Sequence, residues 1–185
     1  MAQADHLVVA ACDLESGARW LEELLGAPLA PGGAHAAMGT HNRLLQLAGG
    51  EPLYLELIAI DPAGTPPARP RWFGLDDPRL QARIAARPRL IHWVARSADL
   101  AREATPAHGD ILAMQRGDYR WRITVPRDGR PPGDGRGLGQ RDHAEVDLGH
   151  DEALFGLGQR ARERAAVGSE DHREAAAGLE QRFLV

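Results

Sequence analysis

The chain has 185 residues, with 22 basic and 26 acidic side chains and a net charge of −4. This length fits one domain or two small modules, and the acidic balance provides no basic surface for nucleic acid. The single cysteine, Cys12, excludes a disulfide framework and a cysteine-based zinc site within the chain. We see neither a signal sequence nor a run of 18 apolar residues, so we expect a cytoplasmic protein with no membrane segment.

The basic residues are all arginine, with no lysine, and Gly and Pro are abundant. This composition is typical of a gene from a GC-rich genome. A single arginine in the sequence therefore carries little information about function.

The first 62 residues predict the order strand, helix and three strands. The helix has the clearest limits, because Asp13 is a candidate N-cap and Gly26 a candidate C-terminal stop. Pro31-Gly32-Gly33 indicates a turn. The expected elements are strands over 6–11, 35–38, 42–47 and 53–60 and a helix over 14–25.

A proline-rich loop over 61–70 and a short helix over 77–86 follow, and the strand–helix order then begins again. We divide the chain into a first module (1–62), a linker with a short helix (63–89), a partial second module (90–133) and a divergent extension (134–185). The expected elements of the second module are strands over 90–95, 111–115 and 119–125 and a helix over 99–105.

The extension is weakly patterned, with ten of the 21 glycines between 127 and 185. Helices are expected there over 152–167 and 170–183. The fourth strand of the second module is not evident, although 143–148 is a candidate that carries Glu145 and Asp147. One hypothesis is that this segment results from a shift of reading frame.

Two segments of the sequence match each other at an offset of 86 residues. His6 and His92 each open an apolar strand, and Asp13 and Asp99 each cap a helix seven residues later. The recurrence of strand, cap and helix in the same order indicates a duplicated βαβββ unit. The predicted fold class is therefore α+β, with paired βαβββ modules of which the second is incomplete or divergent.

These features resemble the vicinal oxygen chelate superfamily, the glyoxalase, bleomycin-resistance and dioxygenase group. The segments HLVVA, LYLELIAIDP, RPRWFGLDDP and RLIHWVAR look like bacterial glyoxalase-like domain proteins, over about residues 4–133. The resemblance implies a divalent metal bound by His6, Glu56 and His92. It also implies a fourth ligand on the last strand of the second module.

The positions and side-chain types of these residues are chemically consistent with this ligand set. Glu56 lies inside an apolar strand, where a carboxylate is costly unless it is paired or bound to a metal. Two imidazoles and one carboxylate suit Fe, Mn, Ni or Zn, with positions left open for substrate. The alternatives are that Glu56 pairs with a neighbouring arginine and that the histidines are ordinary polar residues at strand ends.

Three further residues are candidates for a substrate pocket. Arg96 shares the strand face of His92 and suits a substrate carboxylate, although an arginine here is also typical of the surface. His35 and His41 flank a Gly-Thr turn and suit either the pocket or local hydrogen bonds.

The leading hypothesis is a metal-dependent lyase, isomerase or dioxygenase acting on a small oxygenated substrate, with Glu56 as the catalytic residue. One alternative is a metal-free protein that sequesters an antibiotic-like ligand, and another is the inactive product of a frame-shifted gene. We expect a small-molecule partner and no nucleic acid or membrane. A sheet edge left by the missing strand would favour a homodimer.

Overall fold

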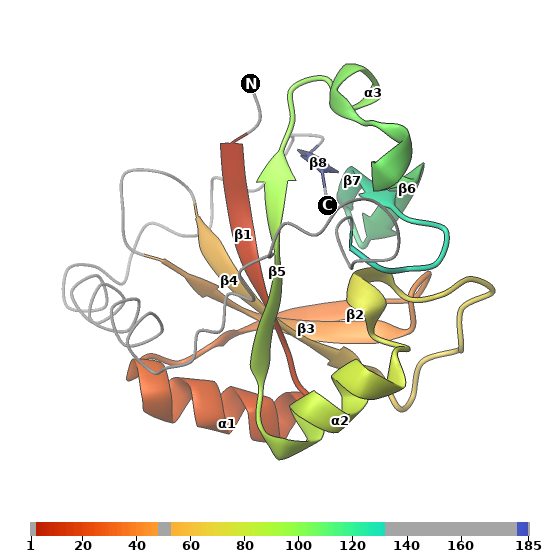
Figure 1. The fold of residues 1–185 in the computed structure, drawn as a ribbon. Helices are drawn as coiled ribbons and strands as arrows, with labels where there is room; N and C mark the ends of the chain where they lie inside the picture. The colour runs from red at the N-terminus through yellow and green to blue at the C-terminus, as the bar shows by residue number, and fades with distance from the viewer. Residues whose placement is uncertain (1–2, 48–52, 132–180, 185) are drawn as a thin grey trace, which may run out of the picture.

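Eight strands form one mixed sheet with the order β2-β3-β4-β1-β5-β8-β7-β6 (Figure 1). The structure is a computed structural model that describes residues 3–47, 53–131 and 181–184. The strands are β1 (Gln3–Ala10), β2 (Ala30–His35), β3 (Thr40–Gln46), β4 (Tyr54–Ile60), β5 (Arg89–Arg96), β6 (Asp110–Arg116), β7 (Tyr119–Val125) and β8 (Gln181–Leu184). The helices are α1 (Leu14–Leu25), η1 (Trp72–Gly74), α2 (Pro78–Ala86), α3 (Leu100–Glu103) and η2 (Pro106–His108).

The first module has the predicted βαβββ order, and α1 has the predicted limits. The Asp13 side chain accepts a hydrogen bond from the Ser16 N–H, and Gly26 adopts a left-handed conformation with φ 67°. The apolar face of α1, which includes Leu21 and Leu25, is buried against one face of the sheet. This packing fixes which side chains of β1 and β4 face the opposite side of the sheet.

The second strand differs from its prediction. Pro31, Gly32 and Gly33 lie within β2 rather than in a turn, and the β2–β3 register shifts between Pro31 and Ala34. A Cβ atom at Gly32 would collide with the Asn42 side chain on β3. The glycines therefore allow β3 to approach a bulged strand.

The two modules join through β1 and β5, which pair antiparallel in the middle of the sheet. In this register His6 lies opposite Val94 and Val8 lies opposite His92, so the two repeats are related by an approximate twofold axis. The second core cluster, which includes Val8 and Val94, lies on the face of the sheet opposite α1, which we call the inner face.

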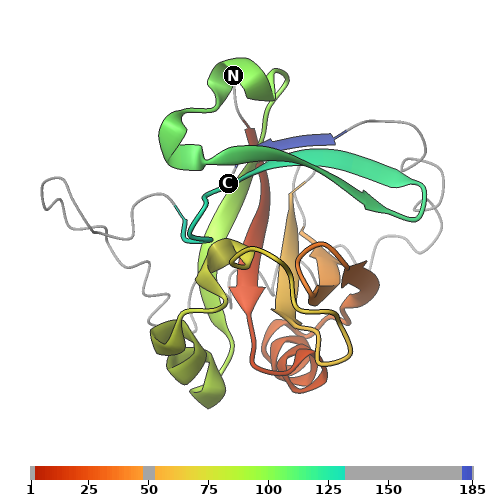
Figure 2. The ribbon, with the colours of Figure 1, turned by 90° about the vertical axis from the view of Figure 1, so that its right-hand side faces the viewer.

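The second module is closed by a strand that the sequence pattern did not reveal. β8 comes from the segment interpreted as an extension and lies between β5 and β7, antiparallel to β5 and parallel to β7 (Figure 2). Its residues 181–183 are extended, so the helix expected over 170–183 is wrong at that end. β8 also fills the gap that was the reason for expecting a homodimer.

The remaining expectations for this segment, including the strand over 143–148 with Glu145 and Asp147 and the helix over 152–167, lie outside the described residues.

The sheet curls so that its two edge strands, β2 and β6, lie against each other. A Cβ atom at Gly33 of β2 would lie 2.8 Å from Cδ of Arg116 on β6, which shows how closely the edges approach. The inner face of the curled sheet therefore becomes a cup with walls from both modules.

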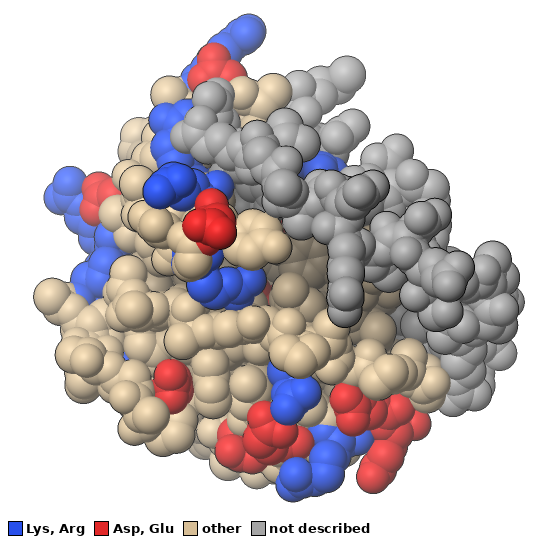
Figure 3. Space-filling view, turned by 180° about the vertical axis from the view of Figure 1, so that it is seen from behind, with Lys and Arg blue, Asp and Glu red and all other residues tan. Residues whose placement is uncertain are grey.

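The surface carries mixed charge. On the face shown in Figure 3, acidic and basic side chains lie next to each other along the lower edge, the edge at which α1 lies in Figure 1. Glu15 of α1 and Arg43 of β3 form one such ion pair, at 2.8 Å. Within the described part of the chain, no helix is long and apolar enough to cross a membrane.

Candidate functional site

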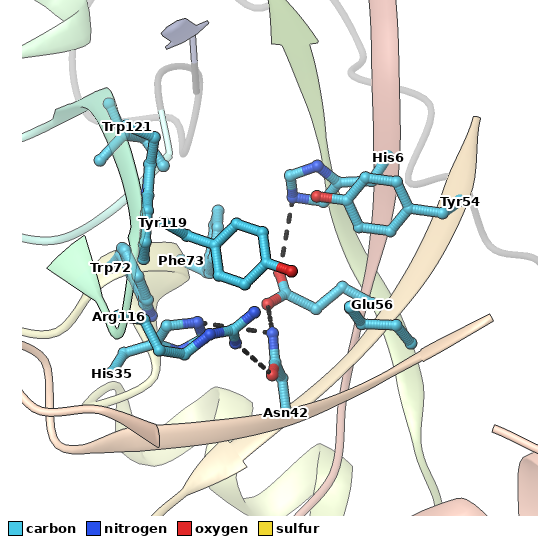
Figure 4. A pocket seen from close by; sticks show the side chains of 12 residues that line it. His6, His35, Asn42, Tyr54, Glu56, Trp72, Phe73, Arg116, Tyr119 and Trp121 are labelled. Atoms are coloured by element: carbon cyan, nitrogen blue, oxygen red, sulfur yellow. Dashed lines mark hydrogen bonds and ion pairs between the residues drawn. The ribbon is translucent and has the colours of Figure 1, made fainter. Parts of the chain in front are cut away.

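A cavity of about 120 Å³ lies in the cup between the modules (Figure 4). Its lining combines a charged group with a wall of aromatic rings. The first module contributes His6, His35, Asn42, Leu44, Tyr54 and Glu56, the linker contributes Trp72 and Phe73, and the second module contributes Arg116, Tyr119, Trp121 and Ile123.

His6 reaches the cavity from the middle of β1 and is only 6% exposed. Its Nδ1–H donates to the Asp5 carboxylate at 2.8 Å, and its Nε2 lies 3.5 Å from Oε2 of Glu56. The ring stacks on Tyr54 with 4.6 Å between ring centroids. Burial lowers the pKa of His6, but the hydrogen bonds and charges of Asp5 and Glu56 outweigh it and raise this pKa to about 9.

Glu56 lies on β4, the central apolar strand of the first module, and is almost fully buried. Its Oε1 accepts a hydrogen bond of 2.5 Å from Nδ2 of Asn42. Burial raises the pKa of Glu56, but His6 above all, together with Asn42, outweighs this effect and lowers the pKa to about 2. Glu56 and His6 therefore form a buried ion pair on the cavity wall.

His35 lines the cavity, as expected for a pocket residue. Its Nε2 lies 3.4 Å from Nδ2 of Asn42, and its Nδ1 lies 3.1 Å from Oγ1 of Thr40. Because the Asn42 amide donates, Nε2 accepts and Nδ1 carries the proton. Burial lowers the pKa of His35, which keeps the ring neutral as it orients Asn42.

The other two predicted pocket residues lie elsewhere. Arg96 points its Nε to Asp5, at 3.7 Å, so it supports the partner of His6 rather than lining the cavity. His41 is half-buried on β3, next to Asn42 in sequence but outside the lining.

His92 is on the same face of the sheet as His6, opposite Val8, but it does not line the cavity. The Phe73 ring lies 5.8 Å from its ring, between centroids. Burial, and then the charge of His6, lower the pKa of His92 to about 4. Its Nε2 is buried and has no hydrogen-bond partner in the described part of the chain, so this orphaned atom needs an explanation.

The structure thus brings together two of the three predicted metal ligands, His6 and Glu56. No group of three or more His, Cys, Asp or Glu side chains close enough to hold a metal ion is found among residues 3–47, 53–131 and 181–184. The last strand of the second module, where the fourth ligand was expected, reads Gln-Arg-Phe-Leu and brings neither a carboxylate nor an imidazole.

The sequence interpretation missed two polar residues of the site. Asn42 bridges the modules, because its Oδ1 accepts from the Gly33 N–H at 2.9 Å and from Nη1 of Arg116 at 3.2 Å. Arg116 lies one residue beyond the strand expected over 111–115, yet it ends β6 on the same face as the buried Met114. That period-two pattern is the signal that marks Arg116 as facing inward.

Comparison with known proteins bears on the family alone. Neither the curated proteins nor the solved structures contain a match to this chain. A family model described as a glyoxalase-like domain matches residues 4–182. The match continues well beyond residue 133, where the resemblance was expected to end, and reaches into β8. The paired βαβββ modules and this match together show that the chain belongs to the glyoxalase-like domain family, within the vicinal oxygen chelate superfamily.

Proposed function

We propose that this protein is a metal-dependent enzyme that acts on a small oxygenated substrate in the cavity between its modules. His6 and Glu56 would hold the divalent ion, with His92 as the third ligand. The orphaned Nε2 of His92 and its position on the same sheet face support its inclusion. Two imidazoles and a carboxylate fit Fe, Mn, Ni or Zn and leave positions open for substrate oxygens.

The observation that carries this proposal is that both main donors are already oriented. Asp5 holds Nδ1 of His6, so that Nε2 faces the cavity, and Asn42 holds Oε1 of Glu56, so that Oε2 faces the same point. A carboxylate behind a ligating histidine is the usual outer-shell arrangement of metal sites. The 3.5 Å between Nε2 of His6 and Oε2 of Glu56 suits two ligands of one ion.

A bound ion would polarise a substrate oxygen and stabilise negative charge on neighbouring oxygens. The chain itself would position the substrate against the aromatic wall and exclude water from the buried ligands His6 and Glu56. Glu56 is the proposed catalytic residue, because its buried carboxylate lines the cavity and would hold the ion next to the substrate.

Metal analysis of the purified protein tests this proposal. We expect close to one first-row divalent ion per chain after supply of Fe, Mn, Ni or Zn, and loss of that ion in the His6→Ala and Glu56→Gln variants. His41→Ala is the matched control, because it removes a nearby imidazole outside the cavity. A folded wild-type protein that takes up none of these ions, or variants that retain the ion, would contradict the proposal.

A second candidate function is metal-free sequestration of a small hydrophobic ligand, as in the bleomycin-resistance branch that the sequence resembles. The observation in its favour is the aromatic wall, to which Tyr54, Trp72 and Trp121 contribute. In this case the His6–Glu56 ion pair satisfies itself and needs no ion. Ligand binding that is unchanged by a chelator, in a protein free of metal, would support this candidate.

A further inference from the structure

Arg116 is a cation that points into the cavity and has no acidic partner among the described residues. Its Nη1 donates to the neutral Oδ1 of Asn42, and no described carboxylate forms an ion pair with it. Its side chain is half-buried at the end of β6, with its stem against Gly33. A guanidinium held in this way keeps most of its donors available, in the planar arrangement that matches a carboxylate.

Among the described side chains around the cavity, no carboxylate is left to balance the positive charge of Arg116. Asp5 lies between His6 and Arg96, and Glu56 contacts His6 and Asn42, so both carboxylates of this group already have partners within it. Arg116 adds a cation on the other side of Asn42. An incoming anion would balance this charge, whereas a neutral ligand would leave it uncompensated.

The rest of the wall defines the shape of the occupant. Trp72 is buried, Trp121 is half-buried, and Tyr119 is 53% exposed at the cavity opening (Figure 4). Flat side chains of this kind favour a flat ligand through stacking and edge contacts. The volume of about 120 Å³ is that of a single-ring molecule, since a cavity of about 150 Å³ is known to hold benzene.

We propose that Arg116 binds the carboxylate of the ligand, and that the cavity accepts small planar monocarboxylates with one ring or a group of similar size. This inference rests on the proposed function only in taking the same cavity as the substrate site. Arg116 forms the anion-binding side of the cavity, and the His6–Glu56 pair forms the opposite side.

The test compares a carboxylate with its neutral isostere. Calorimetric titration of chelator-treated protein with benzoate and with benzamide measures the preference directly. We expect the wild type to bind benzoate about tenfold or more tightly than benzamide, because a charge-assisted hydrogen bond contributes that much. Arg116→Gln should remove this preference, and Arg116→Lys should restore part of it.

Arg120→Gln is the matched control, because Arg120 is an exposed arginine on the neighbouring strand, and it should leave the preference unchanged. Equal binding of the two probes by the wild type, binding of neither at millimolar concentration, or a preference that survives in Arg116→Gln would overturn the inference. Metal content, measured on portions of the same proteins that were supplied with a divalent ion and not treated with chelator, separates the two proposals. Loss of carboxylate preference in Arg116→Gln of a protein that binds no metal would sustain this inference while the metal proposal failed.

Discussion

Asn42 forms hydrogen bonds with a charged side chain of each module. Its amide nitrogen donates to Glu56, and its amide oxygen accepts from Arg116 and from the backbone of Gly33. No other common side chain of this size both donates and accepts in one plane. Asn42 therefore separates the two opposite charges and holds each at a fixed position.

Replacing Asn42 by alanine should destabilise the protein. The buried, ionised Glu56 would lose its amide donor, and hydrogen bonds to charged groups contribute about 1.5–3 kcal/mol. Urea denaturation should show a loss of this size in the free energy of unfolding. Arg43→Ala is the control on the same strand, because its partly exposed ion pair with Glu15 is worth only about 0–1 kcal/mol. Equal losses in the two variants would contradict the role given to Asn42.

The residues of the site differ in how far the sequence reveals them. His6 and Glu56 could be predicted because each lies on a strong strand with a clear alternation, and the repeat connects His6 with His92. The alternation of β6 marks Arg116 as facing inward, but its contact with Asn42 could not be predicted, because the two residues are 74 positions apart and the contact depends on the curl of the sheet. The burial of His92 beneath Phe73 depends equally on tertiary packing.

Elements with local signals were predicted well, and those that depend on neighbours were not. The cap at Asp13 and the apolar face of α1 are properties of the sequence itself, so the predicted limits agree with the structure. β2 was taken for a turn because its glycines are typical of turns, whereas pairing with β3 determines its conformation. β8 has only four residues, and its two neighbours in the sheet make it a strand.

At the scale of elements, the contact between β2 and β6 should control ligand recognition. In a Gly33→Ala variant the new Cβ would lie 2.8 Å from Cδ of Arg116, so the guanidinium must move although its charge remains. We expect weaker binding of benzoate with little change in benzamide binding, measured by calorimetry. Gly64→Ala, in the loop after β4, is the control. Unchanged benzoate affinity in Gly33→Ala would show that the position of Arg116 is not set by this contact.

In the whole molecule, β8 is the strand that holds the two halves of the sheet together on the side of the second module. It pairs with β5 through Ala95 and Arg96 and with β7 through residues 121–123. Without it, the β6–β7 hairpin would lose its described strand pairing to the rest of the sheet. The cup would then lose the wall that carries Arg116.

Removal of residues 181–185 should therefore lower the free energy of unfolding and promote self-association, because β5 and β7 would expose unpaired edges. Denaturation and light scattering measure these two effects. Removal of Val185 alone is the control, since it leaves β8 intact. A monomeric truncated protein with unchanged stability would show that β8 does not hold the hairpin.

The residues that line the cavity are divided between the two modules, and this division has a consequence for how the ligand preference of the protein can change. The groups proposed for chemistry lie on β1 and β4, whereas Arg116, Tyr119 and Trp121 lie on one hairpin, β6–β7. Exchanging that hairpin for one of another sequence would alter ligand preference while leaving the His6–Glu56 pair and its supports in place. The β6–β7 hairpin is thus a replaceable unit that sets ligand specificity. Variation of its sequence would generate new selectivities while the His6–Glu56 pair stays unchanged.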